Sequence, residues 1–216
     1  MTISRSFSPA LALALAATLA AGLSACVPLV VGGAAMSAMV AVDRRTSGAQ
    51  LEDEGIELRG ASRLREAFGA GAHFNLTSYN RQVLLTGEVP DEATKQRAEQ
   101  IVSRVENVRA IVNELVLQGT STLVQRSSDV LITGKVKASL VDAKDLYAGA
   151  FKVVTENSVV YLMGRVTQRE ADRATAIARQ ISGVQRVVRI FEIIGDDELR
   201  RIQTQAAPTA PTTPKP

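Results

Sequence analysis

The sequence is poor in the residues that crosslink a fold or bind metals. Its 216 residues include one Cys, one His and no Trp, and aromatic residues make up only 4% of the chain. A single Cys excludes a disulfide within the chain, and one Cys with one His leaves too few soft ligands for a zinc site. We therefore expect no metal and no cofactor, and one or two modest cores built from aliphatic side chains.

An excess of charge of one sign is also missing. Lys and Arg together number 25 and Asp and Glu number 22, which gives a formal net charge of +3. So small a surplus gives no reason to expect a nucleic-acid partner, and any basic surface has to be local.

Residues arranged for catalysis are missing as well. His73, the sole imidazole, stands at the start of a predicted strand with no assured Ser or Asp partner, and Cys26 is the only thiol. The acidic run 196–198 follows the last predicted strand, where it is typical of a solvated helix start. We assign no catalytic residue and no small-molecule substrate, and we expect that the protein is not an enzyme.

The first 26 residues have the features of a lipoprotein signal peptide. Arg5 supplies a positive charge, residues 11–23 are apolar and rich in Ala, and Leu23-Ser24-Ala25-Cys26 follows at once. The apolar run is short for a membrane span, and the only Cys falls at the position that a lipobox requires. We therefore expect residues 1–25 to be removed and Cys26 to carry the lipid that anchors the mature chain. By resemblance to bacterial lipoproteins, Asp directly after the Cys favours the inner membrane; Val27 stands there, so the outer membrane is expected.

Two segments lie outside the expected folded region. Residues 26–53 are predicted to be a lipidated tether, of which 27–42 are uncharged and rich in small residues; they either lie against the bilayer or form an apolar linker. Residues 203–216 hold four of the seven prolines and are predicted to be a disordered tail, preceded by a short helical extension at 196–202.

The chain between these segments repeats itself. Residues 83–89 (VLLTGEV) and 160–166 (VYLMGRV) match at a spacing of 77 and are predicted strands. A helical pattern follows each of them, the two patterns lying 76 residues apart. Its apolar positions are Ala98, Ile101, Val105 and Val108 in the first copy and Ala174, Ile177, Ile181 and Val184 in the second. Each copy therefore lays an amphipathic helix on a sheet.

Another predicted helix precedes each pair of strands. Its inward positions are Ile56, Gly60, Leu64 and Ala67 in the first copy and Ile132, Val136 and Leu140 in the second. Hairpins at 73–89 and 151–166, with turns near Asn80 and Asn157, and final strands at 110–117 and 185–194 complete the order α-β-β-α-β. The prediction is an α+β fold with two tandem domains, 54–118 and 128–195, joined by a linker at 119–127. In each domain helices pack on one face of a small three-stranded sheet, and we expect the two domains to pack together.

This pattern resembles the BON domain, most closely across residues 153–171. The resemblance rests on a strand ending in Gly-x-Val, a helix with a stripe of Ala and Ile, and Ser-Gly183-Val184-Gln-Arg-Val187. Asn107 stands where the second copy has Gly183, and Ser158 stands where the family often has a turn glycine. Two such domains behind a lipobox resemble the dual-BON lipoproteins of Gram-negative outer membranes, which are associated with division and outer-membrane stress. The resemblance implies a role in envelope integrity at the periplasmic face, binding of anionic phospholipid through the second domain, and no enzymatic activity.

The residues also indicate which copy would contact lipid. Residues 55–118 contain eight basic and eight acidic residues, whereas residues 128–194 contain ten and seven. With Ile132, Val136 and Leu140 inward, the first helix of the second copy presents an outward apolar stripe beside two lysines. The predicted membrane-binding residues are Val130, Leu131, Lys135, Lys137, Ala138 and Val141.

Two alternatives stay open at this stage. The apolar stripe would equally suit packing against the first copy, and the protein would then serve as a non-enzymatic periplasmic adaptor for envelope assembly or division proteins. The sequence identifies neither the phospholipid nor a protein partner.

Overall fold

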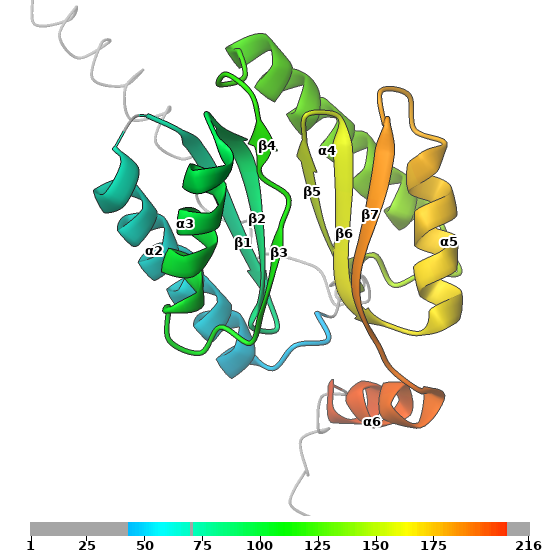
Figure 1. Ribbon diagram of the computed structural model, residues 1–216. Helices are drawn as coiled ribbons and strands as arrows, with labels where there is room; N and C mark the ends of the chain where they lie inside the picture. The colour runs from blue at the N-terminus through cyan, green and yellow to red at the C-terminus, as the bar shows by residue number, and fades with distance from the viewer. Residues whose placement is uncertain (1–42, 70, 207–216) are drawn as a thin grey trace, which may run out of the picture. The chain divides into compact units, whose positions relative to one another are not determined.

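Two copies of the same α-β-β-α-β unit follow each other along the chain (Figure 1). The computed structural model describes residues 43–69 and 71–206. Copy one comprises α2 (Ser47–Phe68), β1 (His73–Tyr79), β2 (Gln82–Val89), α3 (Glu92–Ser103), β3 (Ala110–Asn113) and β4 (Val116–Leu117). Copy two comprises α4 (Leu123–Asp142), the 3-10 turn η3 (Ala148–Ala150), β5 (Phe151–Glu156), β6 (Val159–Val166), α5 (Gln168–Arg179) and β7 (Arg186–Ile193), and α6 (Asp196–Ala206) follows it. The predicted α+β class and the order of elements are confirmed.

Both sheets have the same strand order. In copy one β1 pairs antiparallel with β2, and β3 and β4 pair parallel with β2; in copy two β5, β6 and β7 pair in the same way. The strand predicted at 110–117 is interrupted between β3 and β4, where the Asn113 side chain accepts a hydrogen bond from the backbone of Leu115 at 3.2 Å. This local bond lets Leu115 turn into the core, where it is 1% exposed.

The hairpin turns lie where the sequence places them. Asn80 and Arg81 have φ of 49° and 66°, and Asn157 and Ser158 have φ of 50° and 61°. Two successive left-handed residues make the tight turn that suits the twist of paired strands, and Asn is among the residues that tolerate it.

An aspartate on the first helix of each copy holds each turn. Asp53 of α2 accepts hydrogen bonds from the backbone N–H groups of Asn80 and Arg81 at 2.7 and 2.8 Å. Asp129 of α4 accepts from those of Asn157 and Ser158, both at 2.9 Å. Each helix is therefore fixed to its sheet by polar contacts at the turn as well as by apolar packing.

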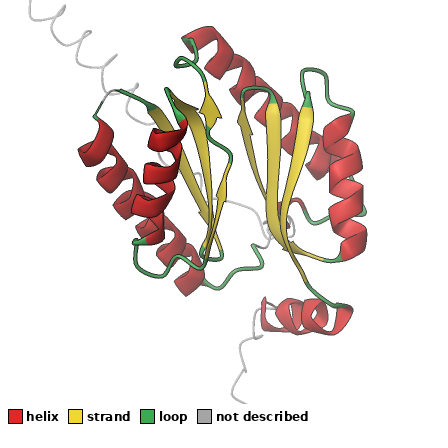
Figure 2. Ribbon diagram, in the orientation of Figure 1, coloured by secondary structure: helices red, strands yellow, loops and turns green. Residues whose placement is uncertain are grey.

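The copies pack sheet against sheet, with their helices outermost (Figure 2). In copy one α2 and α3 cover one face of the sheet through a core that includes Ile56, Leu64 and Val102. In copy two α4 and α5 do the same, through a core that includes Ile132, Val136 and Leu140. The uncovered faces meet in a third cluster, whose buried members are Tyr79, Leu84, Tyr161, Met163 and Ile190. The expected packing of the two domains is confirmed.

Three helices extend beyond their predicted bounds. α2 begins at Ser47, inside the segment predicted as tether, because the Thr46 side chain caps it. α4 begins at Leu123, inside the predicted linker, because Thr122 and Gln125 form a capping box. α6 continues to Ala206, past the predicted extension. Residues 1–42, with the predicted signal peptide and Cys26, and residues 207–216 of the predicted tail lie outside the described residues.

Candidate functional site

The outer face of α4 carries the predicted membrane-binding residues. Val130, Leu131 and Val141 are 70%, 66% and 64% exposed, and Ala138 is exposed as well. Lys135 and Lys137 are exposed, and neither forms an ion pair with any described residue. The structure therefore brings all six residues to one solvent-facing side of a single helix.

Two further apolar residues extend this face and were missing from the prediction. Leu123 and Val124, in the first turn of α4, are each 80% exposed. Leu123 lies seven residues before Val130, and Val124 seven before Leu131, so all four side chains share one side of the helix. The sequence signal that would have included them is Thr122-x-x-Gln125, the capping box that starts the helix.

We call the set Leu123, Val124, Val130, Leu131, Ala138 and Val141, with Lys135 and Lys137, the α4 face. The equivalent side of α2, 76 residues earlier, is polar: Ser47, Gly48, Glu54, Gly55, Ala61, Ser62 and Arg65 stand at seven of these positions. The apolar surface is therefore a property of copy two and not of the fold.

Contacts on the inner side of α4 fix which side faces outward. Ile132, Val136 and Leu140 are buried against the sheet, Asp129 caps the β5–β6 turn, and the Thr133 hydroxyl donates to that of Thr155 at 2.7 Å. Rotating the helix to bury the α4 face would break all of these contacts. The alternative in which this stripe packs against copy one does not occur among the described residues.

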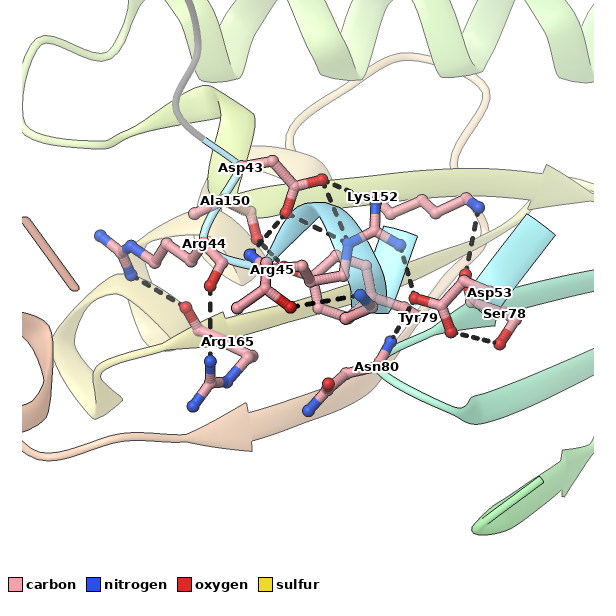
Figure 3. A network of polar contacts seen from close by, with 12 residues as sticks. Asp43, Arg44, Arg45, Asp53, Ser78, Tyr79, Asn80, Ala150, Lys152 and Arg165 are labelled. Carbon is pink, nitrogen blue, oxygen red and sulfur yellow. Dashed lines mark hydrogen bonds and ion pairs between the residues drawn. The ribbon is translucent and has the colours of Figure 1, made fainter. Parts of the chain in front are cut away.

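A network of polar contacts lies around segment 43–45, at the N-terminal end of the described residues (Figure 3). Arg44 forms a two-pronged ion pair with Glu170 at 2.8 and 2.7 Å, with both side chains less than 5% exposed, and it donates to the Arg165 carbonyl at 3.0 Å. Arg45 donates to Asp53 at 2.7 Å and lies over the Tyr79 ring. Segment 43–45 is thereby bound to copy two and to copy one at the same time.

These ion pairs set the charge of the carboxylates. Burial alone would raise the pKa of Glu170, but hydrogen bonds from Arg44 and Thr167 hold that pKa below its ordinary value. For Asp53, burial is likewise outweighed by hydrogen bonds from Ser78, from the turn backbone and from Arg45, which lower its pKa. Both groups are therefore ionised where they hold the segment.

A second polar cluster joins the copies on the opposite strand ends. Glu88 of β2, fully buried, accepts hydrogen bonds from Asn157 at 2.9 Å, from Ser121 at 3.1 and 3.2 Å, and contacts Nδ1 of His73 at 3.0 Å. Glu156 of β5, 7% exposed, accepts from Asn75 and Thr86 at 3.4 Å. A cavity of about 260 Å³ lies beside His73 and Glu156.

The pKa values of the two buried glutamates are shifted in opposite directions. Hydrogen bonds from Ser121 and Asn157 and the charge of His73 outweigh burial and lower the pKa of Glu88, whereas burial and the nearby carboxylates of Glu88 and Asp129 raise the pKa of Glu156. The strand-start histidine thus has a carboxylate partner that the sequence did not reveal.

His73, Glu88 and Glu156 are also the residues that come closest to a metal-ligand set. Their ligand atoms lie within 4.8 Å of one another, and among the described residues they form the one such group. Every one of these side chains already has a hydrogen-bonding partner in the protein. Hydrogen bonding between the copies therefore accounts for the cluster.

Within residues 43–69 and 71–206, no helix combines the length and the apolar character needed to cross a bilayer.

Comparison with known proteins identifies the repeated unit. The BON domain model matches residues 57–119 and 128–195. The outer membrane lipoprotein DolP of Haemophilus influenzae is 37% identical over 174 residues, covering 80% of this chain and 90% of that protein. The 21 kDa hemolysin of Actinobacillus pleuropneumoniae is 32% identical over 155 residues, covering 71% and 80%. The osmotically-inducible protein Y of Escherichia coli is 30% identical over 108 residues, covering 49% and 54%.

Proposed function

The chain belongs to the BON domain family, as an outer-membrane lipoprotein with two BON domains, and from that premise we propose that it binds anionic phospholipid through the α4 face. Anchoring by lipid on Cys26 and a role in envelope integrity that involves binding and not catalysis belong to the same proposal. The family relationship supports the envelope role, and the α4 face supports the choice of copy two.

One observation carries the proposal. Five large aliphatic side chains of α4, Leu123, Val124, Val130, Leu131 and Val141, are each more than three-fifths exposed on one side of one helix. Exposing so much contiguous apolar surface is unfavourable in water, and such surfaces usually mark a contact site.

The lysines favour a membrane over an apolar protein surface. Lys135 and Lys137 lie on either side of the apolar row, at the level where an interfacial helix meets phosphate groups. Each cation near an anionic surface contributes about 1 kcal/mol. Aliphatic residues inserted at the acyl boundary supply the salt-independent part of the binding.

Vesicle binding tests this proposal, with protein that carries no acyl chain so that the anchor does not mask the result. We expect binding to phosphatidylglycerol vesicles and not to phosphatidylcholine vesicles. Lys135→Glu with Lys137→Glu should weaken binding by at least about tenfold at low ionic strength and much less at high ionic strength, since salt screens the attraction. Leu131→Asp should weaken it by about tenfold at every ionic strength.

Copy one offers the matched control. Leu58 of α2 is 74% exposed, so Leu58→Asp makes the same exchange on the equivalent helix and should leave binding unchanged. Wild-type binding by both α4 variants would refute the proposal. If the α4 variants were folded, bound vesicles normally and lost a protein contact instead, the periplasmic adaptor would become the better description.

A further inference from the structure

A groove between α2 and α3, on the outer side of copy one, gathers arginines that have no acidic partner. The groove has a volume of about 580 Å³, and its lining includes Arg63, Arg97, Arg104, Glu66, Ala67 and Ile101. Among the described residues no ion pair involves any of the three arginines, although Glu66 lies in the same lining.

The residues that the structure does not describe supply no carboxylate that could pair with these arginines. Residues 1–42, 70 and 207–216 contain neither Asp nor Glu, so every acidic side chain of the protein belongs to the part that the structure describes. Most other arginines of the fold pair with acids, as Arg173 does with Asp145 at 3.2 Å. The groove therefore holds positive charge that the chain itself does not neutralise.

Two of the three guanidinium groups are held in place. Arg63 donates to the Arg104 carbonyl at 2.6 Å, which stretches it across from α2 to the end of α3. Arg97 lies over the Phe68 ring, 5.6 Å from its centroid. A guanidinium that is already oriented loses less conformational entropy when it binds an anion.

The spacing of the charges indicates what kind of anion fits. Arg97 of α3 and Arg104, the residue that directly follows α3, are seven residues apart, so their Cα atoms are separated by about 10 Å. A single phosphate spans far less than that distance. Carboxylates on a partner helix at i and i+7 have the same separation, and half-buried Ala67 and Ile101 provide an apolar floor between them.

We propose that this groove, the α2–α3 groove, binds an acidic segment of a partner protein through ion pairs of Arg63, Arg97 and Arg104 with carboxylates about 10 Å apart. The corresponding positions of copy two, 76 residues later, are Ser139, Arg173 and Gln180. Only one arginine stands there, and Asp145 neutralises it. The groove is thus specific to copy one, as the α4 face is to copy two.

The test uses the full lipidated chain in detergent and a labelled helical peptide with glutamates seven residues apart, titrated by fluorescence anisotropy. The same peptide with glutamines is the control ligand. Arg97→Gln with Arg104→Gln should weaken binding of the glutamate peptide by about ten- to a hundredfold, because charge-assisted hydrogen bonds are lost. Arg173→Gln with Arg179→Gln removes the same charge from α5 and should leave the affinity within twofold.

The outcomes separate the possible ligands. Leu131→Asp should not alter peptide binding, so failure of the α4 proposal would leave this one standing. Equal affinity of wild type and the Arg97/Arg104 variant, or no binding of the glutamate peptide at millimolar concentration, would overturn the proposal. If inorganic pyrophosphate or phosphatidylglycerol vesicles required these arginines and the peptide did not, the groove would be a phosphate site and the proposal would be wrong. Thermal unfolding of each variant verifies that it is folded.

Discussion

At the scale of single residues, the contact between the copies contains two buried glutamates whose pKa values are shifted in opposite directions. Glu88 is surrounded by donors that favour its ionised form, whereas Glu156 lies near two other carboxylates and accepts only long hydrogen bonds. Since a group stabilises the fold at the pH where its protonation state matches its site, the two glutamates should contribute at opposite ends of the acidic range.

Glu156→Gln is expected to stabilise the protein at pH 7. The folded-state pKa of Glu156 is raised above that of the unfolded chain, so its contribution to stability is complete below the unfolded pKa and is lost as the pH rises through the folded pKa. The amide of the Glu156→Gln variant does not ionise, so this loss of stability does not occur. The thermal unfolding midpoint of the variant should therefore exceed that of the wild type at pH 7, and the difference should disappear toward pH 4.

Glu88→Gln is the comparison for this measurement, with the opposite sign. The pKa of Glu88 is lowered, so its contribution is present above the unfolded pKa and is lost as the pH falls through the folded value. The variant should be less stable than wild type at pH 7, and the difference should shrink in acid. Destabilisation by Glu156→Gln at every pH would show that its carboxylate is ionised and paired.

At the scale of elements, two strand glycines allow neighbouring strands to pass closely. A Cβ at Gly87 would lie 2.0 Å from the His73 carbonyl oxygen, and one at Gly164 would lie 2.3 Å from that of Ala150. The nearest atoms that a side chain would meet there belong to the backbone of the preceding strand or turn and not to a helix. Gly87 also has φ of 122°, which side chains rarely adopt.

Gly87→Val and Gly164→Val should each lower the free energy of unfolding by about 2–4 kcal/mol, since backbone cannot move aside as a flexible side chain can. Chemical denaturation measures the effect. Gly134→Ala is the control, because a Cβ at Gly134 meets nothing within 4 Å and Ala favours a helix by about 1 kcal/mol. Wild-type stability of both valine variants would contradict the equivalence of the copies.

Helices and strands with a strong local pattern could be predicted from the sequence. The hydrogen bonds and ion pairs that join them to distant elements could not. The strands at 83–89 and 160–166 and both hairpin turns are confirmed, since each depends on nearby residues. Asn107 was a departure from Gly183 in the sequence, yet both have positive φ and make the same bend.

What the sequence did not reveal depends on residues far apart in the chain. Asp53 and Asp129 have no local pattern that assigns them to turns 27 or more residues later, as the Asp53 to Asn80 bond shows. The ion pair of Arg44 with Glu170 joins residues 126 positions apart. Six of the eight residues of the α4 face could be predicted because a helix turns with a fixed period, whereas Leu123 and Val124 were missed because they lie in the segment predicted as a linker. Whether the face binds lipid stays a prediction.

At the scale of the whole molecule, the anchor and the fold should be separable. Cys26→Ala removes the thiol that lipidation requires, so the variant should be neither acylated nor sorted to the outer membrane. Its thermal unfolding should match that of the wild type, because residues that follow position 43 form the two cores and the contact between the copies. Fractionation of membranes tests this expectation, and unchanged recovery in the outer membrane would rule out the lipoprotein anchor.

The two surfaces proposed for binding lie on opposite outer sides of the paired sheets. α4 covers the sheet of copy two, and α2 and α3 cover that of copy one (Figure 2). With α4 on a membrane, the α2–α3 groove would face away from it.

The ion pairs of Arg44 and Arg45 also limit the length of the linker between Cys26 and the folded domains. Because they bind segment 43–45 to the fold, only residues 27–42 separate the fold from Cys26, the proposed site of lipidation, and 16 extended residues span at most about 55 Å. A protein held within that distance of its anchor explores a small volume next to the bilayer, so the α4 face would have an effective concentration of roughly a few millimolar there. An intrinsic affinity near 1 mM would then keep the helix on the membrane most of the time. If both proposals hold, the α4 face would release and rebind rapidly while the acyl chains on Cys26 keep the protein at the membrane.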